Sequence, residues 1–557
     1  MNIRLKVLTL AFLLLMASRV DAQKRQIKKY QHQIDEAVEK AYPASVRIWG
    51  FDLKQNQRNS GQFSGVVVSA DGYILTAAHT TSPGKNYKVF FPDGRECIAI
   101  ALGRIDNKDT PGIPDVGMMK ILDKGIWPFA ELGYSSSLAK NEPCISISYP
   151  ESLDQKLPTL RSGRIEEVKN KYGFIRSSCK MEPGDSGGPL FDYMGRVIGL
   201  HSAIDTLEDQ NFEIPVDIYR KYWTALKQEK NYTSFPENKD TVENDPLYKL
   251  IQKDNKSGIY SPKISSSAKF GNISYLLEST LDGKPVKIAA TLFNVTVAGH
   301  ETKQYFLSKN SLVGKNPVIV LNGYRRALKV VQKDQNNDLV LLSFVGKIKG
   351  GIDLKPDLDN QPEIEMGKLL YTAMPNGRQL QGVISSPVFS LPKLTSQAYF
   401  GAMVVYNSSP VYFSLIKAKS PAEVAGLKVG DELISINGKK ISKAEDFSSE
   451  MLKFWPGDEV NFEWLSEGIL KTKKILLAEK NQPHFNHPAE KFEGGKSIRR
   501  DGFNEVFAQD GAVKSTECGT PVFDMNGNFV GINIARFSRT ATICISSKIV
   551  SNFILNN

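Results

Sequence analysis

Most of the chain consists of short apolar runs interrupted by turn residues. Between residues 45 and 214 the runs are rich in Val, Ile, Leu and aromatic residues, and Gly, Pro, Asn and Asp separate them. Clear examples lie at residues 65–69, 87–91 and 196–200. Many short apolar runs with turn signals between them predict the strands of a barrel or a sandwich. We therefore expect a mainly β fold for this region.

Beyond residue 214 the pattern changes several times. Residues 217–227 predict a helix that closes the first region, and residues 229–258 are polar and typical of a linker. Two further β-rich stretches, at about 259–392 and 482–557, flank a segment in which the apolar residues are spaced differently. The total length of 557 residues agrees with this division, because it predicts about three to four domains.

The first residues predict a secretory signal peptide. Arg4 and Lys6 precede an apolar run at residues 7–16, and residues 20–22 resemble a cleavage site. An apolar run of this length is too short to span a bilayer. No later stretch of the sequence is long enough to do so. We expect a mature chain that begins near Gln23, has no transmembrane segment and is extracytoplasmic, that is, periplasmic or secreted.

Composition excludes several classes of protein. Hydrophobic residues make up 41% of the chain and charged residues 24%, the proportions of a folded protein. The net charge is +11, but Lys and Arg are interleaved with acids, so we expect a solvated surface and no nucleic-acid partner. There is no CxxC pair, HExxH motif or P-loop, and we expect no metal and no cofactor. The five cysteines leave at least one thiol unpaired, and the pairing of the others stays open.

Three segments carry residues suited to nucleophilic catalysis. ILTAAH ends in His79 after two small residues, DVGMMKI begins with Asp115 ahead of an apolar strand, and GDSGGPL holds Ser186 among glycines. Each segment alone also has a structural explanation. The histidine could end a strand, the carboxylate could cap a turn, and the glycines could form a flexible loop.

Taken together, the three residues are a Ser-His-Asp set in the chain order His, Asp, Ser. A serine hydroxyl needs a neighbouring base, so His79 would accept the proton of Ser186 and Asp115 would fix the imidazole tautomer. The glycine turn would aim the amides of Gly184 and Ser186 at one point, where an oxyanion could lie. We therefore predict a catalytic triad of His79, Asp115 and Ser186, with an oxyanion hole at Gly184 and Ser186.

These motifs, together with GRVIGLHS and NFEIPVD, resemble the HtrA/Deg group of trypsin-like serine proteases over residues 36–230. The resemblance implies two six-stranded β-barrels with the triad in the cleft between them. Asp185 departs from the pattern, because HtrA enzymes more often have Asn there. In zymogen-activated trypsins that Asp pairs with a new N-terminus, but this chain has no activation-type sequence near its start.

The resemblance also indicates which residues line the primary specificity pocket: Lys180, Met181, Leu200 and His201. Met181 and Leu200 favour a medium-sized apolar pocket, as in HtrA enzymes. The sequence around His201 also resembles glutamyl endopeptidases, whose histidine binds a substrate carboxylate. His201 with Lys180 would then favour acidic side chains. Both alternatives stay open.

Residues 398–480 resemble the PDZ domains of bacterial proteases. The resemblance rests on SPAEVAGLKVGD (420–431), LISING (433–438) and a helical stretch near 443–454. Such a domain binds an extended peptide as an added strand. The turn of Phe400, Gly401 and Ala402 would offer backbone amides to a C-terminal carboxylate, so we expect a peptide ligand in this groove.

The remaining β-rich stretches resemble a damaged copy of the first domain. Ser311 stands at the histidine position, Asp338 at the aspartate position and Cys518 at the nucleophile position. A thiol without a neighbouring base has a small thiolate fraction at neutral pH. We expect a degenerate trypsin-like unit, split by the PDZ insertion, that packs on or regulates the first domain.

The leading hypothesis is an extracytoplasmic serine endopeptidase that acts on protein or peptide substrates. The alternative is a non-enzymatic, chaperone-like scaffold that binds peptides. HtrA relatives are commonly homo-oligomers, but residues 23–40 do not specify this state. The expected fold is mainly β: a trypsin-like double barrel followed by the degenerate unit with its PDZ insertion. The expected division is 1–22 signal peptide, 23–35 N-terminal segment, 36–230 protease domain, 231–258 linker, 259–397 degenerate unit, 398–480 PDZ domain and 481–557 the rest of the degenerate unit.

Overall fold

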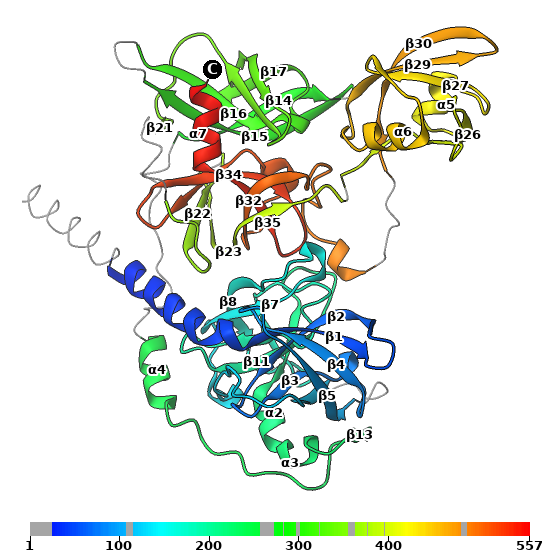
Figure 1. The fold of residues 1–557 in the computed structure, drawn as a ribbon. Helices are drawn as coiled ribbons and strands as arrows, with labels where there is room; N and C mark the ends of the chain where they lie inside the picture. The colour runs from blue at the N-terminus through cyan, green and yellow to red at the C-terminus, as the bar shows by residue number, and fades with distance from the viewer. Residues whose placement is uncertain are drawn as a thin grey trace, which may run out of the picture.

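The computed structural model shows a mainly β protein with few helices (Figure 1). It describes residues 25–106, 115–256, 272–281, 283–296, 301–321, 323–354, 362–375, 377–394, 396–480 and 487–556. The predicted signal peptide, residues 1–22, lies outside the described residues. We call residues 25–256 the first unit. Residues 272–394 and 487–556 together are the second unit.

The first unit contains a closed N-terminal barrel. Its sheet has the order β13-β5-β4-β1-β2-β3-β6, and β5 also pairs with β6, which closes six of the strands into a ring. The strands are β1 Ser45–Asp52, β2 Gln57–Val67, β3 Tyr73–Ala77, β4 Asn86–Phe90, β5 Glu96–Ile105, β6 Val116–Ile121 and β13 Asn231–Tyr232. The 3-10 helices η1 Tyr42–Ala44 and η2 Ala78–Thr80 precede β1 and follow β3.

A second closed barrel follows, with the strand order β10-β11-β12-β9-β8-β7. Its elements are η3 Ser135–Ser137, β7 Pro143–Ser148, η4 Glu151–Leu153, β8 Thr159–Glu167, β9 Ile175–Ser177, β10 Pro189–Phe191, β11 Val197–Ile204 and β12 Asn211–Pro215. The single helix predicted after it is wrong in detail. Two short helices, α2 Val216–Lys221 and α3 Trp223–Leu226, meet at Tyr222, whose φ of −122° interrupts the helical backbone.

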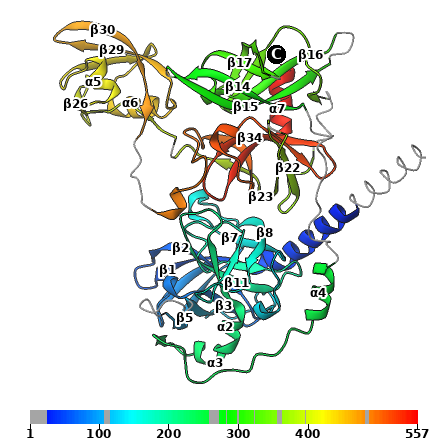
Figure 2. The same cartoon turned by 180° about the vertical axis from the view of Figure 1, so that it is seen from behind.

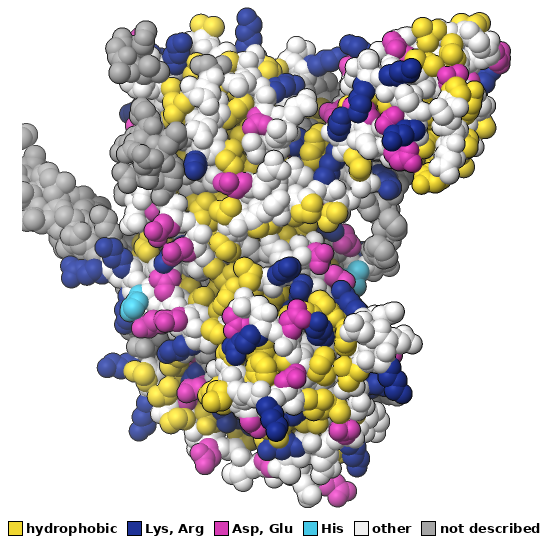
Figure 3. All heavy atoms as spheres, viewed as in Figure 1, with side chains coloured by type: hydrophobic (Ala, Val, Ile, Leu, Met, Phe, Trp, Pro, Cys, Tyr) yellow, Lys and Arg dark blue, Asp and Glu magenta, His cyan; other side chains and the backbone are white. Residues whose placement is uncertain are grey.

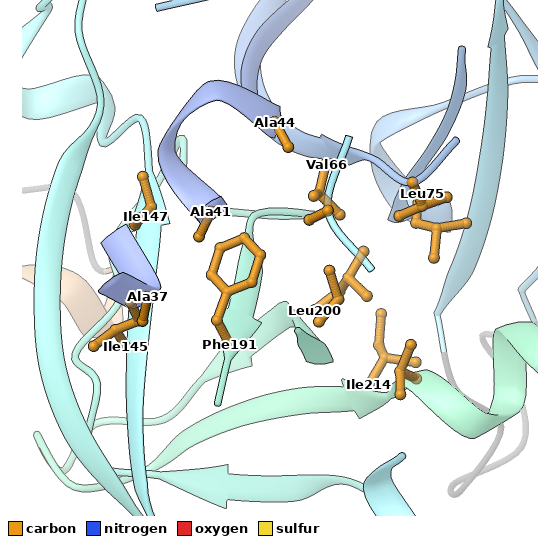
Figure 4. Close-up of a cluster of buried hydrophobic side chains, with 14 of the residues drawn as sticks. Ala37, Ala41, Ala44, Val66, Leu75, Ile145, Ile147, Phe191, Leu200 and Ile214 are labelled. Atoms are coloured by element: carbon orange, nitrogen blue, oxygen red, sulfur yellow. The ribbon is translucent and has the colours of Figure 1, made fainter. Parts of the chain in front are cut away.

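An N-terminal helix, residues 25–41, packs across the barrels of the first unit. Its buried residues recur at helical spacing, which gives the helix one apolar face (Ile27, Tyr30, Ile34, Ala37 and Ala41). Figure 4 shows Ala37 and Ala41 beside Phe191 and Ile145 in the core. The same cluster includes Leu369 from the second unit, so the two units share a hydrophobic core.

The segment predicted to be a linker lies against the first unit. It contains β13 and the helix α4 Tyr248–Lys256. Asp245 is buried and pairs with Arg196, with an Oδ1–Nη1 distance of 3.1 Å. Because this ion pair ties the middle of the segment to β11 and its preceding turn, the segment follows the surface of the first unit.

The second unit begins with an eight-stranded sheet of order β18-β17-β14-β15-β16-β20-β19, on which β21 pairs with β15. No pairing closes this sheet into a ring among the described residues. Its elements are β14 Ser274–Leu281, β15 Lys284–Val295, β16 Lys303–Lys309, η5 Asn310–Leu312, β17 Lys315–Leu321, β18 Tyr324–Ala327, β19 Lys329–Asp334, β20 Leu339–Ser343 and β21 Ile352–Leu354.

A closed barrel of order β22-β23-β32-β35-β34-β33 completes the second unit. Its elements are β22 Leu369–Ala373, β23 Gln379–Leu391, η6 Pro488–Glu490, β32 Phe503–Gln509, η7 Ser515–Glu517, β33 Pro521–Asp524, β34 Phe529–Arg536, β35 Thr542–Ser546 and α7 Ser547–Leu555. The strand order matches that of the corresponding barrel in the first unit. In Figures 1 and 2 this barrel lies between the first unit and the sheet of β14 to β20.

The PDZ domain is inserted between β23 and β32 and has its own core. Its elements are β24 Ala398–Tyr399, β25 Ala402–Val404, β26 Phe413–Ile416, α5 Pro421–Ala425, β27 Glu432–Ile436, β28 Lys439–Lys440, α6 Ala444–Met451, β29 Glu459–Ser466, β30 Ile469–Leu476 and β31 Ala478–Glu479. At the centre of this core Phe400 stacks on Phe462, with ring centroids 4.3 Å apart. The fold prediction of a trypsin-like double barrel, a second trypsin-like unit and an inserted PDZ domain is confirmed.

The surface view agrees with the scattered charge read from the sequence. In Figure 3 basic and acidic side chains are interspersed over the visible face. Within the described part of the chain, no helix is both long and apolar enough to cross a membrane. All five cysteines are buried and free, although the sulfur atoms of Cys144 and Cys179 are 3.8 Å apart.

Candidate active site

The structure brings His79 and Asp115 together at the end of two paired strands. β3 leads into the 3-10 turn η2, which carries His79, and Asp115 immediately precedes β6, the neighbour of β3. The His79 backbone amide donates to Asp115 Oδ1 at 2.7 Å, and His79 Nδ1 lies 2.5 Å from Asp115 Oδ2. The carboxylate therefore orients the imidazole through both its backbone and its ring.

A third group completes the surroundings of Asp115. Ser202 Oγ, from β11 of the other barrel, donates to Asp115 Oδ2 at 2.9 Å. The aspartate is partly buried while the imidazole is 42% exposed, so the ring faces the open cleft between the barrels. No motif in the sequence indicates this role of Ser202, because the role depends on how the two barrels meet.

Ser186 lies in the same cleft as His79. The cleft, of about 530 Å³, is lined by both residues and by Met181, Gly184 and Ser202, among others. Two glycines make the sharp turn possible: Gly184 has a φ of +96° and Gly187 a φ of +76°. These are left-handed conformations that favour glycine. A Cβ on Gly187 would stand 1.9 Å from Thr76 Oγ1, so no other residue fits the turn there.

The peptide bond before Gly184 is oriented as an oxyanion hole requires. The Pro183 carbonyl accepts a hydrogen bond from the Glu151 amide at 2.8 Å. In a trans peptide the N–H points opposite to the carbonyl, so the Gly184 N–H points away from Glu151. Neither this amide nor that of Ser186 donates to an acceptor in the described part of the chain. Both remain available for a developing oxyanion.

Ser64, from β2, holds the same turn from the first barrel. Its hydroxyl donates to the Gly184 carbonyl at 2.8 Å, and its amide donates to the Ser186 carbonyl at 2.9 Å. Tyr149 N donates in turn to Ser64 Oγ at 2.9 Å. Ser64 therefore fixes the nucleophile turn against the opposite barrel, a role with no signature in the sequence.

Asp185, the departure from the HtrA pattern, is fully buried and paired. Arg161 Nη1 lies 3.0 Å from Asp185 Oδ1, and Ser148 Oγ donates to the same oxygen at 2.8 Å. The Glu182 amide donates to Asp185 Oδ2 at 2.9 Å. An internal arginine thus supplies the positive charge next to the nucleophile turn, and the arrangement needs no new N-terminus.

The four predicted pocket residues lie in different environments. Met181 lines the cleft. Leu200 is fully buried in the core of the first unit, and neither it nor Lys180 or His201 is among the residues that line the cleft. Lys180 Nζ lies 3.4 Å from a carboxylate oxygen of Glu208, and burial lowers the lysine pKa to about 8.

His201 is enclosed and uncharged. Its Nε2 lies 2.5 Å from Ser146 Oγ, and its Nδ1 lies 3.6 Å from a carboxylate oxygen of Glu213. Burial, with a further contribution from the charge of Arg161, lowers the pKa of His201 to about 3. Burial also holds the pKa of the Glu213 carboxyl well above its usual range. A neutral, enclosed imidazole gives no support to binding of a substrate carboxylate.

The predicted carboxylate-binding turn of the PDZ domain is well formed. Phe400 is buried beneath it, Gly401 has a φ of +82°, and Ala402 begins β25. A Cβ on Gly401 would stand 2.2 Å from the Cβ of Ser420, so the turn requires glycine.

The second unit repeats the backbone of the active site. The Ser311 amide donates to Asp338 Oδ1 at 2.7 Å, as the His79 amide does to Asp115. The Gly519 amide donates to the Asn533 carbonyl at 2.7 Å, which matches the bond between Gly187 and His201. Ser311, Asp338 and Cys518 therefore occupy the three predicted positions of the degenerate site.

At this site Asp338 forms a buried ion pair with Lys309, the last residue of β16. Lys309 Nζ donates to Asp338 Oδ2 at 2.6 Å, to the Arg499 carbonyl at 2.9 Å and to the Ile534 carbonyl at 2.8 Å. All three protons of the ammonium group are thus used. Cys518 is completely buried, and burial raises the pKa of its thiol. The ammonium group of Lys309 is therefore fully paired, and the thiol of Cys518 is enclosed.

No histidine that the structure describes is hydrogen-bonded to Cys518. His487 lines the cleft of the first unit, with His79 and Ser186. His484 lies outside the described residues. Among the described residues, Cys518 Sγ has Ser497 Oγ at 3.9 Å and the Lys514 carbonyl at 3.8 Å as its polar neighbours.

Comparison with known families agrees with this geometry. The family model of the trypsin-like peptidase domain matches residues 63–200, and that of the PDZ domain matches residues 398–477. The fold and the site define the first unit as a trypsin-like serine peptidase domain. Its combination with a PDZ domain, together with the relatives described next, makes the chain similar to HtrA-like serine proteases.

Parts of this chain are similar to named proteins. A putative serine protease, HhoB, of Synechocystis sp. is 29% identical over 34% of this chain and 47% of its own length. A probable periplasmic serine endoprotease, DegP-like, of Hahella chejuensis is 24% identical over 69% of this chain and 73% of its own length. A solved structure, the serine endoprotease from Yersinia pestis, covers 80% of this chain at 15% identity, with a TM-score of 0.30. The chain spans 47%, 40% and 34% of the length of the first three curated relatives.

Proposed function

We propose that this protein is a serine endopeptidase that acts outside the cytoplasm, with Ser186 as nucleophile, His79 as general base and Asp115 as the residue that orients His79. The observation that carries the proposal is the short pair of contacts from His79 to Asp115 in the cleft that Ser186 also lines. An orienting acid on the imidazole is what a serine nucleophile needs.

In the proposed reaction Ser186 Oγ attacks a peptide carbonyl carbon while its proton passes to His79 Nε2. The amides of Gly184 and Ser186 stabilise the oxyanion of the tetrahedral intermediate. His79 then gives the proton to the leaving nitrogen, and the C–N bond breaks to leave an acyl-enzyme. Water, deprotonated by His79, attacks this ester and releases the second product and the free serine.

In this proposal residues 36–230 perform the catalysis, residues 398–480 bind extended peptide or protein C-termini, and the second unit is not catalytic. Met181 on the cleft wall supports an apolar primary pocket. The naming of relatives as periplasmic supports the location. A purely non-enzymatic scaffold is not favoured, because it would not need the oriented imidazole or the unpaired amides of the nucleophile turn.

The direct test is hydrolysis of an unfolded protein substrate by the full chain and by Ser186→Ala. We expect wild-type protein to cut the substrate and the variant to lose more than about a thousandfold in rate. Asp115→Asn, which keeps the size of the side chain, should lose activity of similar order because it favours the wrong imidazole tautomer. Undiminished hydrolysis by Ser186→Ala would reject the assignment.

A further inference from the structure

We propose that the second unit positions the wall of the active cleft that carries Met181, and that Arg536 and Arg539 are the positioning residues. Both lie at or just after the end of β34, far in sequence from the cleft, yet they reach the loop of residues 205–210 in the first unit. The inference rests on the proposed function, because it concerns the same site. It assigns a task to a unit that has lost its own catalytic groups.

Arg539 holds the backbone of this loop. Its guanidinium donates to the Asp205 carbonyl at 2.9 Å and to the Leu207 carbonyl at 2.8 Å, and its side chain is fully buried. The side chains of Asp205 and Leu207 are exposed, so the loop contributes little apolar burial of its own. The planar, forked guanidinium holds the two carbonyls in one fixed geometry.

The same arginine reaches the cleft through one more residue. Arg539 Nη2 lies 3.4 Å from Asn211 Oδ1, and that oxygen accepts a hydrogen bond from the Met181 amide at 3.1 Å. Met181 lines the cleft beside the nucleophile turn. A continuous set of hydrogen bonds therefore joins the second unit to the wall that contacts the substrate.

Arg536 supports the other side of the loop. Its Nη2 lies 3.3 Å from Glu208 Oε1, and Glu208 Oε2 lies 3.4 Å from Lys180 Nζ, one residue before Met181. Arg536 also donates to the Arg539 carbonyl at 2.6 Å. The two arginines thus contact residues 205–211 directly. They are connected to residues 180–182 through Glu208 and Asn211.

The backbone of Arg536 is itself held by Ser497, which lies beside Cys518. Ser497 N donates to the Arg536 carbonyl at 2.9 Å, and Arg536 N donates to Ser497 Oγ at 3.0 Å. The guanidinium lies 5.0 Å from the ring of Phe492. The segment that follows His487 therefore runs from the active cleft to the neighbourhood of Cys518 and holds the arginine that supports the active cleft.

Other hydrogen bonds also join the two units. Asp510 Oδ2 accepts from the Ser162 amide at 2.8 Å, while its Oδ1 accepts from the Val383 amide of the second unit at 2.8 Å. Gln31 of the N-terminal helix bonds to the backbone of Gly367 and Leu369. Because these contacts are independent of the arginines, removal of one arginine leaves the units docked and frees only the loop.

The test compares the full-length proteins Arg539→Met and Arg536→Met with the control Arg378→Met. Arg378 is an arginine of the second unit that pairs with Glu517 in the same unit, at 3.0 Å. We measure kcat and KM on peptides that differ only in the residue before the cleaved bond, and the rate of serine labelling by a fluorophosphonate. We expect Arg539→Met to lose about tenfold to a hundredfold in kcat/KM. The ratio of kcat/KM values between the different peptides should also change. The control should change neither.

A variant on the protease side keeps the inference testable if the arginine variants fail to fold. Glu208→Gln removes the charge that joins Arg536 to Lys180 and leaves the second unit intact, and it should also change the ratio between peptides. If folded Arg539→Met and Glu208→Gln keep wild-type kcat/KM and wild-type ratios, the positioning role is overturned. Absence of labelling in the wild-type protein would instead overturn the proposed function, so the two failures are distinct.

Discussion

The enclosed histidine His201 predicts a specific acid sensitivity of the first unit. Its pKa is lowered to about 3 in the folded protein, mainly by burial. An unfolded chain has the ordinary histidine pKa of about 6.5. Between these two values the unfolded state binds a proton that the folded state does not. Stability is therefore lost as the pH falls from about 6.5 towards 3.

The magnitude follows from the two pKa values. At pH 5 the difference in proton binding corresponds to about 2 kcal/mol of lost stability, and at pH 7 to almost none. His201→Gln removes the titrating group but keeps a side chain that can hydrogen-bond to Ser146. The buried carboxyl of Glu213 remains in both proteins, and Arg161 does as well, so their effects largely cancel in the comparison.

The assay is urea unfolding of wild type and His201→Gln at pH 7 and pH 5, followed by tryptophan fluorescence. Three of the five tryptophans, Trp49, Trp127 and Trp223, lie in the first unit. Because Gln does not titrate, any cost of the substitution is the same at both pH values. Wild type should therefore lose about 2 kcal/mol more than the variant between pH 7 and pH 5. Equal losses in the two proteins would refute the claim that His201 is neutral and enclosed.

Three other substitutions test separate parts of the site. Gly184→Ala would place a Cβ 2.5 Å from Glu151 N at a φ of +96°, so we expect kcat to fall about a hundredfold to a thousandfold in peptide assays with little change in KM. Arg161→Met leaves the Asp185 carboxylate buried without its cation, which should cost about 3–5 kcal/mol in urea unfolding and slow serine labelling; unchanged stability would contradict the role of the pair. Cys518→Ala should leave peptide hydrolysis at the wild-type rate, and a folded but inactive variant would show that the second site matters for chemistry.

The order of motifs along the chain was enough to predict the fold class and to single out His79, Asp115 and Ser186, which the structure places around one cleft. GDSGGPL and TAAH are specific because their small residues are required by close backbone contacts, as the space around Gly184 and Gly187 shows. The split second unit was also predictable, because the Asp338 strand and the Cys518 turn keep the local residue pattern of the Asp115 strand and the Ser186 turn. In each case local sequence determines local backbone.

The rest of the site depends on contacts between distant segments. Ser64, Ser202 and Arg161 are ordinary residues in their own strands, and they matter only because the two barrels close around the nucleophile turn. The burial of His201 could not be read from a motif that it shares with glutamyl endopeptidases. Lys309 was not singled out either, since a lysine at a strand end is usually solvated and this one is fully enclosed by two distant carbonyls.

To test most directly whether Ser186 is the nucleophile of a single active site, we would find which residue a serine-directed fluorophosphonate modifies in the full-length protein. After labelling and digestion, peptide mass spectrometry locates the adduct. We predict one adduct, on Ser186, that is absent from His79→Ala, and none on the second unit. An adduct elsewhere, or equal labelling of Ser186 without His79, would contradict a single active site built on His79, Asp115 and Ser186.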